Sequence, residues 1–167
     1  MKKTLIYIVV VSLVTALLSG CDFYETRPAK FEFLQSRENV EKVEICTNSE
    51  AYGWIEGKHV NSLETIAELP PEEIDEFWNA LLEIAAVDVL RNTTGDMCGD
   101  LLFAISYANG QKELISFYSI GVVNADGTFE EYRLLAVEDS KALAQLFAKY
   151  ADPKLLREVS KGFRSYY

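Results

Sequence analysis

Residues 101–120, LLFAISYANGQKELISFYSI, decide the fold. Two apolar runs flank Asn109-Gly110, and Asn-Gly is the strongest short signal for a β-hairpin with a two-residue turn. One face of such a hairpin would carry Phe103, Ile105, Tyr107, Leu114 and Tyr118, and the other Leu102, Ala104, Ile115 and Phe117. Because neither face is plainly polar, we expect the hairpin to be central in its sheet and covered on both sides for part of its length.

Further strands surround this hairpin. Residues 40–46, VEKVEIC, alternate apolar and charged side chains, which predicts a strand with one wet face. Short strands are also expected over 63–69 and 87–90. Asp126-Gly127 marks a second turn, and residues 129–137 supply a third strand that completes a β-meander.

Helix signals lie on both sides of the meander. Pro70-Pro71-Glu72-Glu73 favours a helix start, because proline suits the first helical position and acids suit the positive end of the helix dipole. Glu138-Asp139-Ser140 can cap a second helix, and Asp152-Pro153 begins a third that Gly162 would end. The first helix would have one apolar face, made of Ile74, Phe77, Trp78, Leu81, Leu82 and Ala85.

The order of these elements predicts the fold class. Strands, a helix, a meander and then helices indicate an α+β fold, with an antiparallel β-meander sheet and helices packed mainly on one face. One globular domain would cover residues 31–167, and residues 21–30 would form a tether in front of it.

The N-terminus has the pattern of an export signal. Lys2 and Lys3 precede an apolar run from Leu5 to Leu18, which at fourteen residues is shorter than the roughly 20 needed to span a bilayer. Leu18-Ser19-Gly20-Cys21 follows, and it resembles the lipobox of bacterial lipoprotein precursors. The resemblance implies that residues 1–20 are a signal peptide cleaved between Gly20 and Cys21.

The same resemblance implies a diacylglyceryl thioether on Cys21 and acylation of the new amino group, such as by palmitate. Two or three acyl chains hold a protein on a membrane far more firmly than one. We therefore expect an extracytoplasmic domain in the cell envelope, anchored to a bacterial membrane through Cys21. In some Gram-negative lipoproteins an aspartate in the place of Asp22 implies retention at the inner membrane.

Charge restricts the class of partner. Residues 21–167 contain 14 basic and 26 acidic residues, a net charge of −12. This charge opposes nucleic-acid binding, which depends on cationic side chains neutralising phosphates. It also opposes binding to anionic lipid, so the acyl chains would do the anchoring. A cationic protein or peptide remains compatible with the charge.

Two cysteines remain once Cys21 is modified. Outside the cytoplasm an isolated pair is usually a disulfide, so we expect Cys46 to bond to Cys98. Free thiols and a metal site with the acids around Cys98 and with His59 are the alternatives. No CxxC or HxxxH spacing supports the metal site.

No catalytic or cofactor motif is present in the sequence. The single histidine, His59, lies in the polar stretch GKHVNS, and there is no GxSxG, P-loop or GxGxxG pattern. The sequence thus predicts no catalytic, cofactor or metal residues. Tyr52 and Trp54 lie on a predicted exposed turn and are candidates for partner contact, although packing within the core would also explain them.

The domain also resembles the small, mostly uncharacterised α+β domains of bacterial lipoproteins. The resemblance rests on a hairpin and turn pattern made of Ile105, Tyr107, Asn109-Gly110, Glu113, Ile115 and Asp126-Gly127. Together the observations predict a non-catalytic, membrane-anchored lipoprotein with a binding or envelope-associated role. The alternatives are an inhibitor or immunity protein for a cationic secreted enzyme such as a lysozyme, and a small hydrolase.

Overall fold

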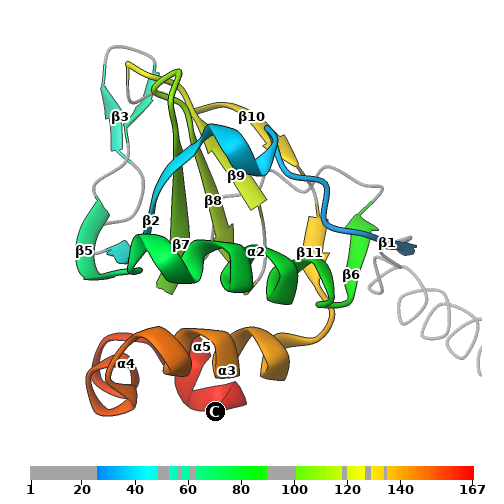
Figure 1. The fold of residues 1–167 in the computed structure, drawn as a ribbon, viewed down its shortest axis with the longest axis vertical. Coiled ribbons are helices and arrows are strands. Elements are labelled where there is room, and N and C mark those ends of the chain that lie inside the picture. Colours follow the sequence, from blue (N-terminus) through cyan, green and yellow to red (C-terminus); the bar gives the residue numbers. More distant parts are fainter. Residues whose placement is uncertain are drawn as a thin grey trace, which may run out of the picture.

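A computed structural model describes residues 26–48, 53–55, 58–60, 63–89, 101–117, 120–126, 129–133 and 135–167 (Figure 1). The strands are β1 (Thr26–Ala29), β2 (Val40–Asn48), β3 (Gly53–Ile55), β4 (Lys58–Val60), β5 (Leu63–Glu68), β6 (Ala86–Val89), β7 (Leu101–Tyr107), β8 (Lys112–Ser116), β9 (Ile120–Val123), β10 (Phe129–Arg133) and β11 (Leu135–Val137). The helices are α2 (Ile74–Leu82), α3 (Ser140–Tyr150), α4 (Pro153–Val159) and α5 (Lys161–Tyr166), with 3-10 turns η1 (Arg37–Asn39) and η2 (Pro71–Glu73).

Six strands form the main sheet, in the order β10-β9-β8-β7-β2-β5, and every neighbouring pair is antiparallel. The run β7-β8-β9-β10 is a meander, and β2 joins it beside β7. The side chains of β7 and β8 are nearly all buried, as expected for a central hairpin. These features confirm the α+β class with an antiparallel meander sheet.

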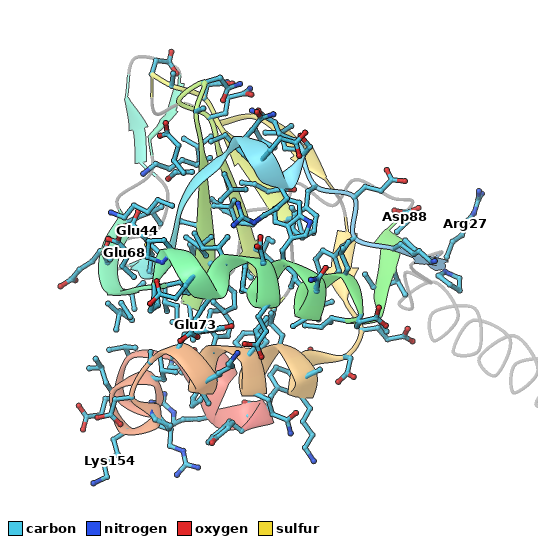
Figure 2. The ribbon with its side chains drawn as sticks, in the orientation of Figure 1. Arg27, Glu44, Glu68, Glu73, Asp88 and Lys154 are labelled. Atoms are coloured by element: carbon cyan, nitrogen blue, oxygen red, sulfur yellow. The ribbon has the colours of Figure 1, made fainter. Side chains whose placement is uncertain are left out.

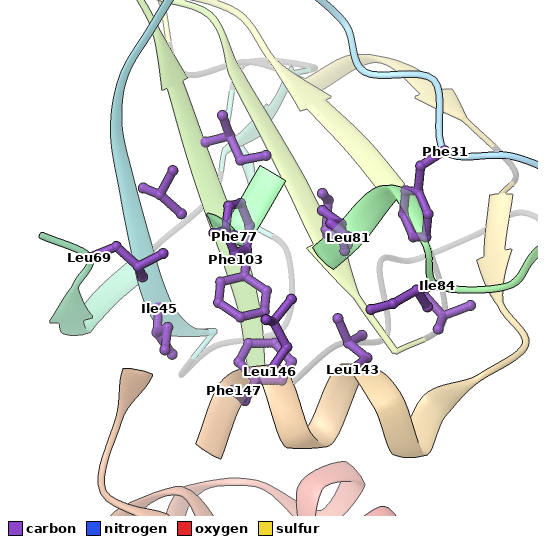
Figure 3. Packing of buried hydrophobic residues seen from close by; sticks show 14 of the residues in the cluster. Phe31, Ile45, Leu69, Phe77, Leu81, Ile84, Phe103, Leu143, Leu146 and Phe147 are labelled. Carbon is purple, nitrogen blue, oxygen red and sulfur yellow. The ribbon is translucent and has the colours of Figure 1, made fainter. Parts of the chain in front are cut away.

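The helices pack on one face of this sheet. Phe103 of β7 contacts Phe77 of α2, with ring centroids 4.9 Å apart, and stacks on Phe147 of α3 at 4.1 Å. Figure 3 shows these aromatic rings in the centre of the cluster, between Leu69 and Ile45 on one side and Ile84 and Leu143 on the other. The contacts confirm that helices cover mainly one face.

The hairpin has a different register from the one that the sequence predicted. Ile105 pairs with Glu113, whereas a two-residue turn would have paired it with Leu114. The loop has three residues: Gly110 N–H donates to the Tyr107 carbonyl at 2.8 Å, and Tyr107 N–H donates to the Gln111 carbonyl at 2.9 Å. Gly110 has φ +83, the left-handed conformation of a turn that ends in a bulge.

A shift of one residue moves every side chain of β8 to the opposite face. Ile115 and Phe117 therefore join the cluster beneath the helices, and Leu114 lies on the other face with Cys46, Leu102, Ala104 and Val123. The same shift moves Glu113 to the helix-covered face, opposite Ile105. Its burial there is a direct result of the three-residue loop.

A second, three-stranded sheet joins distant parts of the chain in the order β1-β6-β11. In β1, Thr26 pairs with Val89 and Ala29 with Ala86. This strand lies inside residues 21–30, for which we expected a tether, so backbone pairing begins earlier than Phe31. Figure 1 shows β1 at the level of α2, on the helical side of the molecule, far from β3.

The helix ends follow capping rules at most positions. The Asp139 carboxylate accepts from Ala142 N–H, and Asp152 accepts from Lys154 N–H just before Pro153, as the sequence predicted. The prediction that Gly162 ends the last helix was wrong. Ser160 ends α4 and its hydroxyl accepts from Phe163 N–H, which starts α5 with Gly162 inside it.

Candidate functional site

The structure describes only some of the residues that the sequence singled out. Trp54 lies in β3, where its backbone pairs with His59 of β4 in a two-stranded sheet. Cys46 lies in β2 and is buried. The lipidation and cleavage residues Gly20 and Cys21, together with Tyr52 and Cys98, lie outside the described residues. Because Tyr52 is outside the described residues, the proposed partner contact through Tyr52 and Trp54 stays a prediction.

Cys46 is enclosed by the sheet, and among the described residues it has no disulfide partner. Its side chain is 2% exposed, and its Sγ lies 3.9 Å from Oγ1 of Thr65 on β5. Burial raises the pKa of this thiol to about 11. A thiol with that pKa is protonated at neutral pH and is a poor nucleophile or metal ligand. Because Cys98 is outside the described residues, the disulfide between them stays a prediction.

An ionic cluster lies beside Cys46, where β2 meets the edge strand β5. Lys42 Nζ contacts Glu44 Oε1 at 2.9 Å and Glu68 Oε2 at 3.1 Å, and Thr65 Oγ1 donates to Glu44 at 2.8 Å. Figure 2 shows Glu44 and Glu68 close together on this side of the molecule. The cluster ties β5 to β2 and leaves Glu68 at an edge that a charged side chain protects from further strand pairing.

Glu44 in this cluster is held as a carboxylate. Burial of the group favours the neutral acid, but the hydrogen bonds from Lys42 and Thr65 outweigh it and hold the pKa of Glu44 below its ordinary value. The hydrogen bond to Glu44 likewise raises the pKa of Lys42. A carboxylate and an ammonium group that stabilise each other in this way are poor donors and acceptors of protons near pH 7.

Glu113 is an acidic side chain enclosed in the fold, at 1% exposed. Its Oε2 accepts a hydrogen bond from the Tyr107 hydroxyl at 2.6 Å and another from Leu34 N–H at 2.9 Å. The first bond links β8 to β7 across the hairpin. The second fastens the segment that follows β1 to the sheet, so Glu113 joins the N-terminal chain to the core.

Aromatic packing holds the same N-terminal segment on α2. Phe33 stacks on Trp78, with ring centroids 3.5 Å apart, and Phe31 lies 6.4 Å from Phe33. Phe31 itself is 4% exposed. Together with the bond from Leu34 to Glu113, these contacts give the Glu113 region a structural explanation. Sequence reasoning missed this region because the predicted two-residue turn would place Glu113 on the opposite face of the hairpin, away from Ile105.

Charge is divided between two parts of the surface. Around η2 and α2 the exposed charged side chains are acidic, at Glu72, Asp75, Glu76 and Glu83, beside Leu82, which is 40% exposed. Residues 140–167, which form α3, α4 and α5, hold six basic and two acidic residues, a net charge of +4. Residues 21–139 hold eight basic and 24 acidic residues, a net charge of −16.

One ion pair joins the two parts: Lys149 Nζ of α3 lies 2.7 Å from Glu76 Oε1 of α2. A second pair lies within the first part, where Arg37 Nε is 2.7 Å from Asp75 Oδ1. Each of these pairs includes a carboxylate that is largely exposed, so screening by solvent keeps their contribution to stability small. The surface therefore presents an acidic region over η2 and α2 and a basic region over the C-terminal helices.

Within the described ranges, no three His, Cys, Asp or Glu side chains are grouped as ligands for a metal ion. Among the same residues no helix is long and apolar enough to cross a membrane. Comparison with protein-family models, curated proteins and solved structures finds no match to this chain.

Proposed function

We propose that this chain is a bacterial lipoprotein whose extracytoplasmic domain has a non-catalytic binding role at the cell envelope. Two observations of different kinds support the proposal. The pattern Leu18-Ser19-Gly20-Cys21 supports the anchor. The division of the surface into an acidic and a basic region supports binding, because complementary charge guides the association of macromolecules.

The local chemistry of the buried polar groups also favours binding over catalysis. The Cys46 thiol has a pKa raised by burial to about 11, and Glu44 is paired with Lys42. Glu113 accepts two hydrogen bonds within the fold. A nucleophile or general base needs a pKa matched to its task and access to substrate, and these side chains serve packing and pairing instead.

The anchor is tested by labelling cells with radioactive palmitate. We expect the wild-type protein to carry label, and Cys21→Ala to accumulate as an unlabelled, unprocessed precursor. Cys46→Ala is the matched control, because it removes a buried cysteine and keeps the lipobox, so it should be labelled like wild type. Label that persists on Cys21→Ala contradicts the proposal.

The acidic region around α2 favours a second candidate function, inhibition of or immunity to a cationic secreted enzyme such as a lysozyme. Glu72, Glu76, Glu83 and the apolar side chain of Leu82 are exposed on the same η2–α2 segment, a combination suited to a basic partner with an apolar contact. Calorimetric titration with basic cell-wall hydrolases at low salt tests it. We expect binding that Glu72→Gln with Glu83→Gln weakens; no binding at low salt rejects this candidate.

A further inference from the structure

The C-terminal helices expose apolar side chains that a domain surrounded by water would be expected to bury. The described residues include four large hydrophobic side chains that are substantially exposed, and three of them lie in residues 155–167: Leu155 at 40%, Val159 at 39% and Tyr167 at 48%. Exposed apolar side chains that gather in one segment mark an interaction surface more often than scattered ones do.

Basic side chains occupy the same short segment. Lys154, Arg157, Lys161 and Arg164 are exposed, and Glu158 is the only acidic residue in residues 153–167. Figure 2 shows Lys154 extending away from the body of the molecule at the end of the helical layer. A cationic, partly apolar surface on a chain that is otherwise strongly acidic has a specific partner chemistry: an anionic surface with an apolar interior beneath it.

The fold presents this segment as a rigid body. Leu156 of α4 and Phe163 of α5 are fully buried and attach the two helices to the core. Tyr166 packs on Phe117 beside β8, with ring centroids 5.2 Å apart. Asp152 and Ser160 cap the two helices. Because the buried side of the segment is fixed, its basic and apolar side chains are held on the outside without further ordering.

We infer that the α4–α5 surface, residues 153–167, rests on an anionic phospholipid bilayer. Lysine and arginine would contact the headgroups, and Leu155, Val159 and Tyr167 would enter the interface, as in other surface-bound helices. The inference deepens the proposed function, because it depends on an anchor at Cys21 that keeps the domain at the bilayer. The net charge of −12 describes the whole of residues 21–167, whereas residues 140–167 have a net charge of +4, and this local charge would attract anionic lipid.

The position of β1 is compatible with this orientation. Cys21 and Thr26 are five residues apart, so the chain between them reaches at most about 17 Å. Figure 1 shows β1 at the right edge of the molecule, beside β6 and at the level of α2; the helical end lies below this level, with α4 at the lower left, and β3 lies near the upper end. An acyl anchor that close to β1 favours contact of the bilayer with the helical end over the end that holds β3.

Hydrogen–deuterium exchange of the full-length protein on vesicles tests the inference. The protein is reconstituted into vesicles of phosphatidylcholine alone or with phosphatidylglycerol, and exchange is read on peptides within 153–167. We expect these peptides to exchange more slowly on the anionic vesicles only, and 0.5 M salt to remove roughly all of the difference because it screens the charges. Equal exchange on both kinds of vesicle overturns the inference.

Charge variants separate the lipid contact from other causes. Lys154→Glu with Arg157→Glu should abolish the slowing, whereas Lys154→Arg with Arg157→Lys should keep it. If the reversed variant fails to fold by circular dichroism, Leu155→Ser with Val159→Ser replaces it and should reduce the slowing. Slowing on phosphatidylcholine alone that increases with protein density would indicate contact with an acidic region of a second copy, and would overturn the inference.

Flotation of the same vesicles separates failure of the anchor from failure of the docking surface. Protein that floats with both kinds of vesicle but shows no slowing at 153–167 keeps the anchor and rejects the docking surface. Protein that floats only with anionic vesicles, and loses this with Lys154→Glu and Arg157→Glu, rejects the anchor and supports the surface. Protein that floats with neither rejects both.

Discussion

Glu113 connects three parts of the chain through one carboxyl oxygen. Oε2 accepts from Tyr107 on β7 and from Leu34 in the segment after β1, while the residue itself belongs to β8. A polar group removed from water loses stability unless its hydrogen bonds are replaced. The same cost applies to the two donors, because Leu34 N–H and the Tyr107 hydroxyl each donate a hydrogen bond to Glu113. We expect this residue to be sensitive to substitution although it has no catalytic assignment.

Tyr107→Phe tests this interaction with little change in shape. The substitution removes the 2.6 Å hydrogen bond to Glu113 and keeps the buried ring, so we expect a loss of about 1–3 kcal/mol in the free energy of unfolding. Urea denaturation measures it. Tyr167→Phe is the control, since Tyr167 is exposed, and it should change stability by less than about 0.5 kcal/mol. Equal effects of the two variants would contradict a special role for Glu113.

Because its thiol is buried, Cys46 should make the free energy of unfolding depend on pH. Its thiol has a folded-state pKa of about 11 against an ordinary value of 9.0, because burial disfavours the thiolate. Between those pH values the unfolded chain has released this proton and the folded chain retains it. Stability should therefore be complete below about pH 9 and fall as pH rises toward 11, by up to about 2 kcal/mol from this group.

The measurement compares wild type with Cys46→Ala from pH 7 to 11, in the presence of a reductant. Other groups titrate in this range, so the informative quantity is the difference between the two proteins at each pH. We expect any stability advantage of wild type to shrink above pH 9. A constant difference would show that the thiol is accessible to water in the folded protein.

At the scale of the element, the β7–β8 hairpin shows what a turn sequence determines and what it leaves open. Asn109-Gly110 correctly predicts the hairpin, but Asn-Gly fits both a two-residue turn and the last two positions of a three-residue loop. The choice depends on which face of β8 the core favours. Phe117 and Ile115 pack beneath the helices and Leu114 packs on the other face, and this packing is a tertiary property.

Gly110→Ala should destabilise the hairpin. A non-glycine residue in the left-handed conformation costs roughly 1–2 kcal/mol, and the added Cβ would also lie 3.1 Å from Cβ of Ala125. Thermal unfolding measures the loss. Combining the change with Ala125→Gly removes the close contact and keeps the unfavourable φ, so the double variant separates the two causes. No loss in Gly110→Ala would contradict the three-residue loop.

Helices were more predictable than strands because their signals are local. Proline and acids stand at the start of η2 and α2, and Asp152 before Pro153 accepts from the first turn of α4, so these signals lie within a few residues of the helix that they start. The error at Gly162 has the same origin. Glycine usually marks a helix end, but here Gly162 is buried inside α5, and the Ser160 cap defines the boundary instead.

Ser160→Ala should weaken the start of α5. Its buried hydroxyl accepts from Phe163 N–H at 2.9 Å, and loss of such a cap costs about 1–2 kcal/mol. Ser165→Ala is the control, because the Ser165 hydroxyl is exposed and donates within the last turn of the same helix. Chemical denaturation compares the two, and equal stability of both variants would contradict the importance of the cap.

On the scale of the whole molecule, the α+β class and the single helical layer followed from the order of elements. The sheet β1-β6-β11 did not, because each of its strands is only three or four residues long and they come from distant parts of the chain. Short strands carry little periodicity, and DFYETRPAK is polar enough to resemble a linker. The contact between β1 and β6 depends on tertiary pairing that no local pattern records.

Chains that begin at three different residues test the contribution of β1 to stability. A chain that begins at Thr26 should be as stable as one that begins at Cys21, whereas a chain that begins at Phe31 loses four cross-strand pairs with β6. We expect the shorter chain to lose about 1–3 kcal/mol, at up to 1 kcal/mol for each pair. Differential scanning calorimetry compares them. Equal transition temperatures for all three would show that β1 contributes nothing to the fold.

The pairing of β1 also sets the length of unpaired chain between an anchor at Cys21 and the folded domain. With β1 paired, Thr26 is five positions after Cys21, and the chain between them reaches about 17 Å. With β1 released, Phe31 is ten positions after Cys21, and the reach is about 35 Å. Phe31 and the Leu34–Glu113 bond would then become the next points that resist a pull. Single-molecule stretching from residue 21 would record this extension as a separate step before the domain unfolds. The pairing or release of this four-residue strand would thus set the maximum distance of the domain from the membrane.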